Sequence, residues 1–374
     1  MKKQLFYGLC VSLFISSSLS ASSDLIFNNI RKLSMGNAGV ATIADDSALY
    51  VNPAGLHNVK SFHWKFPRLR AEVSTDYIDH ASEFNDLMND NSNQEEILQN
   101  LVPFKGGFNA QISPLTSYVQ KDFGIGAFGG IETLTKIVNK VDPTLHMQGN
   151  TDLAIAAGMS HKTTVLEHPV VLGISGKFIN RSIIYNDLTG EDGLSMGSTE
   201  LINAINDNTL SDRLGKTYGV SGFGIDLGLL TPFDFHGQTG TFGMAIRNIA
   251  GTLNGNQTVN NQSRDVSVEL PVTTVLGIAM TPELPYFGQF DVAADYHLYP
   301  STTFFTGLYM GVEKKFFGNL LSLRTGLSQG YPTFGAGVDL SVFHLNYAYY
   351  SKEMGTVAGK EGMSYHVLEL GFLF

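Results

Sequence analysis

The sequence predicts an all-β protein, a transmembrane β-barrel of fourteen antiparallel strands. Apolar residues alternate with small or polar residues along fourteen segments between Phe62 and Phe374. After the N-terminal residues, no apolar run reaches the ~20 residues that a membrane-spanning helix needs. Long and short connections also alternate between the segments, as they do in outer-membrane barrels. A secreted β-sandwich or propeller is the competing class, because its strands would alternate too.

Residues 1–20 are predicted to be an export signal. Lys2 and Lys3 precede a mainly apolar run, and small residues follow it. The single cysteine, Cys10, falls inside that run, so the exported chain should contain neither a disulfide nor a cysteine nucleophile. The net charge of −10 argues against nucleic acid as a partner.

The segment that follows, residues 34–56, reads neither as a strand nor as a long helix. Asp45, Asp46 or Ser47 is expected to cap a short helical turn. Asn52 precedes Pro53 and is therefore biased away from the α region, so the turn should stop there.

The alternating segments have one apolar face and one face of small, polar or charged residues. Residues 290–298 show the pattern: Phe290, Val292 and Tyr296 share one face, while Asp295 and His297 share the other. A polar face made mainly of Gly, Ala and Ser with isolated charges suits an enclosed lumen. The fourteen segments are 62–76, 105–119, 123–136, 151–162, 168–184, 217–230, 240–253, 269–281, 286–298, 304–316, 319–328, 332–341, 343–350 and 363–374.

Every second connection is expected to face the outside of the cell, and the longest of these are 77–104, 185–216 and 251–268. Within 198–207, Leu201, Ile202 and Ile205 form one apolar face of a predicted helix. That face would either line an extracellular groove for an apolar solute or pack over the barrel mouth.

The last strand ends on Phe374, and its apolar residues alternate outward from Leu368. A terminal aromatic on an amphipathic strand resembles the signal that the outer-membrane barrel insertion machinery reads. That machinery and outer-membrane lipid are therefore expected partners.

Two motifs near the N-terminus resemble the hatch signature of the FadL family, which comprises outer-membrane transporters of hydrophobic compounds. They are Gly36-Asn-Ala-Gly-Val-Ala-Thr-Ile-Ala-Asp-Asp46 and Asn52-Pro-Ala-Gly-Leu56. The stretches 247–249, 270–271, 311–313 and 323–326 are similar to the PorV-like branch of the same superfamily. The resemblance implies a barrel (62–374) plugged by an N-terminal hatch (21–61). It also implies that Asn52, Pro53 and Ala54 are hatch residues and that Asp45 and Asp46 anchor the hatch.

The family also has a kink in the third barrel strand that opens the wall sideways. The corresponding strand here contains Gly124, Gly126, Gly129 and Gly130. Glycine inside a strand often marks a bulge or a close approach. The same residues would equally make room for the hatch.

The resemblance implies a channel for passive uptake of hydrophobic compounds, with long-chain fatty acids as the leading substrate class. It places the channel in the outer membrane of a Gram-negative-type bacterium. The alternative is a PorV-like barrel that docks exported proteins and moves no solute. The expected lumen charges, paired with one another or with the hatch, are Asp226, Asp291, Asp295, Arg247, Arg324 and Glu313.

An enzyme is not predicted. Asp295 and His297 would point inward on one strand, but no serine in a recognisable nucleophile motif accompanies them. No metal-ligand spacing occurs among the ten histidines, and no cofactor is predicted.

Overall fold

A computed structural model describes residues 27–65, 67–89, 93–210, 212, 215–298, 303–340 and 343–372. The predicted export signal (1–20) and the terminal Phe374 lie outside the described residues.

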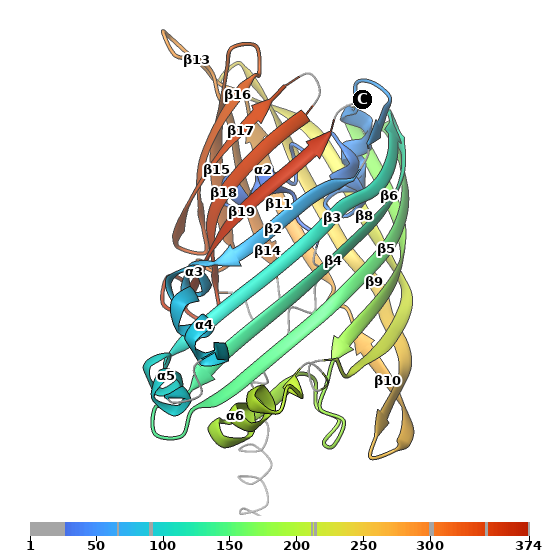
Figure 1. Ribbon diagram of the computed structural model, residues 1–374. Helices are drawn as coiled ribbons and strands as arrows, with labels where there is room; N and C mark the ends of the chain where they lie inside the picture. The colour runs from blue at the N-terminus through green and yellow to red at the C-terminus, as the bar shows by residue number, and fades with distance from the viewer. Residues whose placement is uncertain are drawn as a thin grey trace, which may run out of the picture.

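Fourteen antiparallel strands close into a barrel, which confirms the predicted fold class (Figure 1). Closure occurs where β19 pairs with β2, because β2 also pairs with β3. The barrel strands in order are β2 (Arg68–Ser74), β3 (Phe104–Gln120), β4 (Phe123–Val138), β5 (Thr144–Val165), β6 (His168–Ile184), β8 (Thr217–Phe235), β9 (Gln238–Val259), β11 (Thr273–Met280), β14 (Asp291–Leu298), β15 (Leu308–Phe316), β16 (Leu321–Ser328), β17 (Tyr331–Asp339), β18 (Phe343–Glu353) and β19 (Gly362–Phe372).

Burial alternates residue by residue along these strands, as the predicted faces require. On β6, Leu172, Ile174 and Phe178 are exposed, whereas Ser175 and Lys177 are buried. Large apolar side chains exposed on the outer wall include Ile125, Ile155, Met159, Leu227, Ile278, Leu323, Leu345 and Leu368. A band of exposed apolar side chains around a closed barrel is the lipid-facing surface of a membrane barrel. No helix among the described residues is long and apolar enough to cross a membrane.

The two ends of the barrel differ. At one end, here the turn end, residues 121–122, 166–167 and 236–237 connect successive strands. The helices of the long loops gather at the opposite end, here the loop end (Figure 1). These loop elements are α3 (Thr75–Asp79), α4 (Ala81–Asn89), α5 (Gln94–Asn100), β7 (Leu194–Gly197) and α6 (Ser198–Asn206).

Several predicted boundaries differ from the structure. Segment 62–76 is divided into β1 (His63–Lys65) and β2, because Pro67 has no N–H for a strand ladder. Residues 251–268 are not an open loop: β10 (Gln262–Glu269) pairs with the far half of β9 and extends the wall as a hairpin. The strand predicted from 286 starts at Asp291, because β12 (Glu283–Leu284) and β13 (Gly288–Gln289) form a small hairpin of their own.

Residues 27–59, here called the hatch, lie inside the barrel. They contain helix α2 (Ile30–Ser34) and the 3₁₀ helices η1 (Asp46–Leu49) and η2 (Pro53–Asn58). Asp45 caps η1 by accepting a hydrogen bond from the Ser47 backbone N–H, which satisfies one of the free donors at that helix end.

Candidate functional site

The candidate site is the interface between the hatch and the inner wall, beginning with Asp46. Its carboxylate is fully buried and accepts a hydrogen bond from Arg68 Nη2 at 2.6 Å. Lys65 Nζ pairs with the same carboxylate. A buried carboxylate between two cations is tolerated because its charge is compensated, and it ties the hatch to β1 and β2.

Asn52 holds the centre of the hatch. Its side-chain oxygen accepts from the Ala54 N–H at 3.1 Å and so caps η2, with Pro53 at the first helical position. Its side-chain nitrogen donates to Val40 O at 2.9 Å and to Leu229 O on β8 at 3.4 Å. One buried amide therefore joins two parts of the hatch to the barrel wall.

Nine inward-facing glycines let the hatch approach the wall at backbone distance. A Cβ added to Gly173 would lie 2.6 Å from Ala54 Cα, and one added to Gly243 would lie 2.8 Å from Ala41 Cα. The nine are Gly124, Gly158, Gly173, Gly228, Gly243, Gly277, Gly311, Gly326 and Gly335, and each faces a hatch atom. The inner glycines that suggested an enclosed lumen thus mark the seat of the hatch.

Ion pairs complete this seat on the opposite wall. Arg31 of α2 bonds Glu313 on β15 through Nε at 2.8 Å, and Arg324 bonds the other oxygen of Glu313 at 2.7 Å. Asp295 accepts the backbone N–H groups of Gly39 at 2.8 Å and Val40 at 3.0 Å.

Another pair of the wall is Lys177–Asp226, at 2.8 Å between Nζ and Oδ1. The Asp291 carboxylate bonds Lys315 at 2.8 Å. His297 is buried beside Tyr309, with ring centroids 4.2 Å apart. On the same strand as His297, the carboxylate of Asp295 accepts the hydrogen bonds from the hatch backbone N–H groups.

The hatch is also attached to the turn end of the barrel, through contacts that the sequence did not suggest. Asp122 receives hydrogen bonds on one side-chain oxygen from Ser160 Oγ at 2.9 Å and pairs there with His57 Nδ1 at 2.6 Å. Its backbone N–H donates to Leu56 O at 3.1 Å. Partial burial raises the pKa of Asp122, but the hydrogen bonds from His57 and Ser160 outweigh that effect and lower it.

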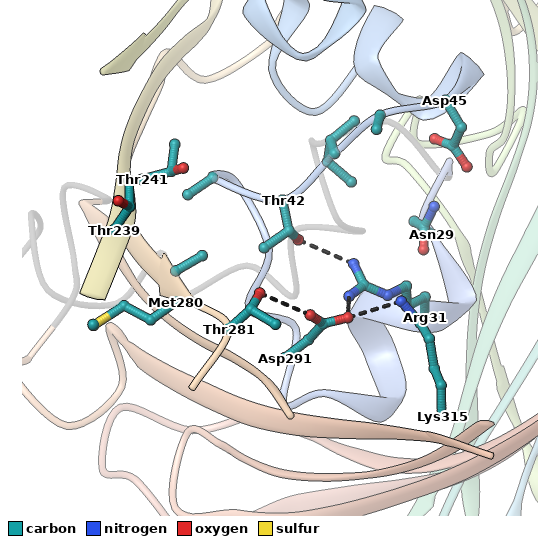
Figure 2. A pocket seen from close by; sticks show the side chains of 14 residues that line it. Asn29, Arg31, Thr42, Asp45, Thr239, Thr241, Met280, Thr281, Asp291 and Lys315 are labelled. Atoms are coloured by element: carbon teal, nitrogen blue, oxygen red, sulfur yellow. Dashed lines mark hydrogen bonds and ion pairs between the residues drawn. The ribbon is translucent and has the colours of Figure 1, made fainter. Parts of the chain in front are cut away.

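A cavity of about 450 Å³ lies between the hatch and the turn-end parts of β9, β11, β14 and β15 (Figure 2). Arg31 reaches across it to Thr42 at 3.1 Å and to Asp291 at 3.5 Å. The lining also includes Asp45 and Lys315, so this space is polar and its charges are mixed. Burial acts to raise the pKa of Asp45, but Lys65 and Arg68 lower it to about 2.

The barrel wall is interrupted at one place in β3. Its pairing with β4 skips from Ile112–Gly129 to Thr116–Ala127, so residues 113–115 face the single residue Phe128. On the other side, β2 pairs with β3 only as far as Ile112, and β1 resumes at Ser117. Residues 113–115 therefore lack ladder partners on both flanks, and Thr116 lacks one on the side of β1 and β2.

Aromatic side chains fill the lumen behind this interruption. Phe128 is buried, with its ring 5.7 Å from Phe27 and 5.3 Å from Tyr50 of the hatch. Pro114 lies in the unpaired stretch and has no N–H to donate. Backbone groups that lack ladder bonds and an apolar inner surface together make this a weak place in the wall.

The four glycines of the predicted kink lie on β4, directly opposite. β4 pairs with β5 without a register shift, and the extra residues belong to β3 instead. Gly124 faces the side chains of Leu56 and Leu49, so it makes room for the hatch. Gly126 and Gly129 face Phe128 and Leu115, at the interruption itself, and Gly130 pairs regularly with Gln111.

The loop helices form an apolar cap at the loop end. Leu201 and Ile205 of α6 are buried against Leu98 of α5 and Phe104 of β3, and Ile202 packs partly buried beside them. Gln94 and Asn206 exchange side-chain amide hydrogen bonds of 3.2 Å between α5 and α6. In this conformation the three predicted groove residues pack within the cap.

These features define the class: a fourteen-stranded membrane barrel seated around an internal hatch. The sequence matches no known family profile and no curated protein.

Solved structures share the architecture. A TodX deletion mutant, described as a monoaromatic hydrocarbon channel, is 14% identical with a TM-score of 0.50, over 93% of this chain and 99% of its own. CymD, also described as a monoaromatic hydrocarbon channel, is 14% identical with a TM-score of 0.50, over 94% and 98%. The Ralstonia pickettii toluene transporter TbuX is 13% identical with a TM-score of 0.49, over 95% and 99%. The chain therefore shares its fold with TodX and CymD.

Proposed function

We propose that this protein is an outer-membrane channel for passive uptake of hydrophobic compounds. The observation that carries the proposal is the wall interruption at residues 113–115, backed by the aromatic cluster of Phe27, Tyr50 and Phe128. An apolar solute gains by staying out of water, so a path from the lumen into the bilayer suits it. The hatch, tied to strands all round the wall, closes the direct route through the barrel to ions.

On this proposal the loop end faces the outside of the cell, since long loops do so in outer-membrane barrels. A solute passes the apolar cap, reaches the aromatic cluster and leaves between β3 and β4 into the membrane. Support comes from the shared fold of TodX and CymD, which are described as hydrocarbon channels. Long-chain fatty acids, the class that the family resemblance implies, differ from hydrocarbons by a carboxylate. The charge of the lumen therefore bears on whether the solute is a fatty acid or an uncharged compound.

The exit is tested by stapling the wall beside the interruption. Thr116 and Ala127 are direct cross-strand partners, close enough for a disulfide between cysteines at these positions. Oxidised Thr116→Cys/Ala127→Cys should lose most uptake of a radiolabelled hydrophobic solute into vesicles, and reductant should restore it. The matched staple Ala110→Cys/Ile131→Cys lies in the regular part of the same ladder and should have no effect. Equal uptake through both staples would refute the lateral exit.

The docking alternative stays a prediction, and copurification addresses it. A stable exported partner recovered with the barrel, together with no solute flux, would favour docking over uptake.

A further inference from the structure

A row of polar side chains crosses four neighbouring strands on the inner wall, away from the hatch contacts. Glu72 is paired in register with Asn109, Asn109 with Glu132, and Glu132 with Asn150. Directly paired residues of antiparallel strands share a face, with side chains about 5 Å apart. Their sequence neighbours Phe108 and Ile131 are exposed on the outer wall, so the row itself points into the lumen.

Three members of this row lack partners among the described residues. Asn109 and Asn150 are each only 5% exposed, yet Oδ1 of the first and Nδ2 of the second make no hydrogen bond to any described group. Glu132, between them, forms no ion pair or hydrogen bond with a described residue. Buried polar groups of native proteins nearly always have partners, so this row is complementary to a polar group that the chain does not supply.

Glu72, at the end of the row, is by contrast engaged. It accepts a hydrogen bond from Tyr350 at 2.9 Å and lies 3.5 Å from Arg70 Nη1. The ring of Tyr350 is stacked on Tyr365, with centroids 5.3 Å apart. Arg70 compensates the charge of Glu72, so the net charge of the row is negative and is carried by Glu132.

The row also lies on the proposed path of the solute. Glu132 lies four residues from Phe128 on β4, on the side of the loop end, so the two side chains share the inner face of the wall. The aromatic cluster at Phe128 follows on the same strand toward the hatch. A solute that enters the lumen from the loop end meets the row before it reaches the aromatic cluster.

We propose that Asn109, Glu132 and Asn150 form a subsite for the hydroxyl group of an otherwise apolar solute. A hydroxyl donates one hydrogen bond and accepts others, which matches the carboxylate of Glu132 or Oδ1 of Asn109 on one side and Nδ2 of Asn150 on the other. A carboxylate has no proton to donate at neutral pH and is repelled by Glu132. The inference rests on the proposed uptake function and narrows its substrate class to aliphatic alcohols rather than fatty acids.

The test compares 1-decanol with decanoate, which have equal chain length, by calorimetric binding to the purified barrel at pH 8. Wild type should bind decanol at least about tenfold more tightly than decanoate, the size of one charge-assisted hydrogen bond. Glu132→Gln should weaken decanol binding by about tenfold and leave decanoate binding unchanged or stronger. The matched control Glu269→Gln removes the same charge from an exposed position on β10 and should change neither constant.

Asn150→Leu provides a second variant that removes a buried polar group instead of a charge, and it should weaken decanol binding several-fold. Equal affinity for the two ligands, or the same affinity ratio in Glu132→Gln as in wild type, would overturn the subsite and leave the uptake proposal standing. Failure of both ligands to bind the wild-type protein would overturn the subsite and the uptake proposal together.

Discussion

Replacing Gly173 with alanine should displace the hatch without unfolding the barrel. The new Cβ would lie 2.6 Å from Ala54 Cα and closer still to Ala54 N and Pro53 C. Carbon atoms pack at roughly 3.5–4.0 Å, so the backbones must separate by about 1 Å. The neighbouring Asn52 amide, bonded to Val40 and Leu229, resists that shift.

Overpacking of this kind costs about 1–3 kcal/mol. A cost of ~2 kcal/mol changes the ratio of seated to displaced hatch about 30-fold. The expected result is a higher ion conductance across planar bilayers, with the heat-modifiable gel mobility of the folded barrel retained.

Gly176→Ala is the matched control, because it lies on the same strand with nothing within 4 Å of the added Cβ. Its conductance should equal that of wild type. If Gly173→Ala also conducts like wild type, the hatch does not depend on backbone contact with β6, and the reasoning fails.

The remaining predictions concern charge. Asp46→Asn should lower the free energy of hatch docking by about 3–5 kcal/mol, because Arg68 is left buried without its counter-charge. Asp45→Asn keeps the helix cap and should cost far less. Protease digestion of the hatch would measure both effects. The folded-state pKa of Asp45 is lowered from 3.8 to about 2, so its contribution to docking is complete above about pH 4 and is lost as the pH falls toward 2. In wild type the ion conductance should therefore rise as the pH falls from about 4 to 2. In Asp45→Asn the rise should be smaller, because Asp45 no longer contributes to it. On the outer wall, Ile174→Lys should destabilise the barrel by about 2–4 kcal/mol in vesicles, whereas Leu166→Lys at an exposed turn should cost almost nothing; equal unfolding free energies would contradict the lipid-facing assignment.

Local patterns predicted the barrel well because strand faces are a local property. The alternation at Asp295 and His297 placed both side chains inward, and the structure confirms it. A capped turn at Asp45, Asp46 or Ser47 was also predictable, since the hydrogen bond of the cap spans only two residues, and the structure selects Asp45.

What sequence reasoning missed depends on contacts between distant segments. The glycines of β4 drew attention to that strand, but the extra residues lie on β3, where Pro114 was the overlooked signal. The partners of Asp46 and Asn52, and the position of Glu132 between Asn109 and Asn150, are set by strand register and by the position of the hatch, and neither can be read from local periodicity. The buried environment of Leu201 likewise depends on a loop about a hundred residues away.

The central claim is that the barrel carries apolar solutes across the membrane, and flux tests it most directly. Vesicles containing the purified protein should take up radiolabelled 1-decanol faster than protein-free vesicles and with saturation, while the hatch keeps their ion permeability low. Uptake no faster than in protein-free vesicles, with the barrel shown to be folded, would contradict the account.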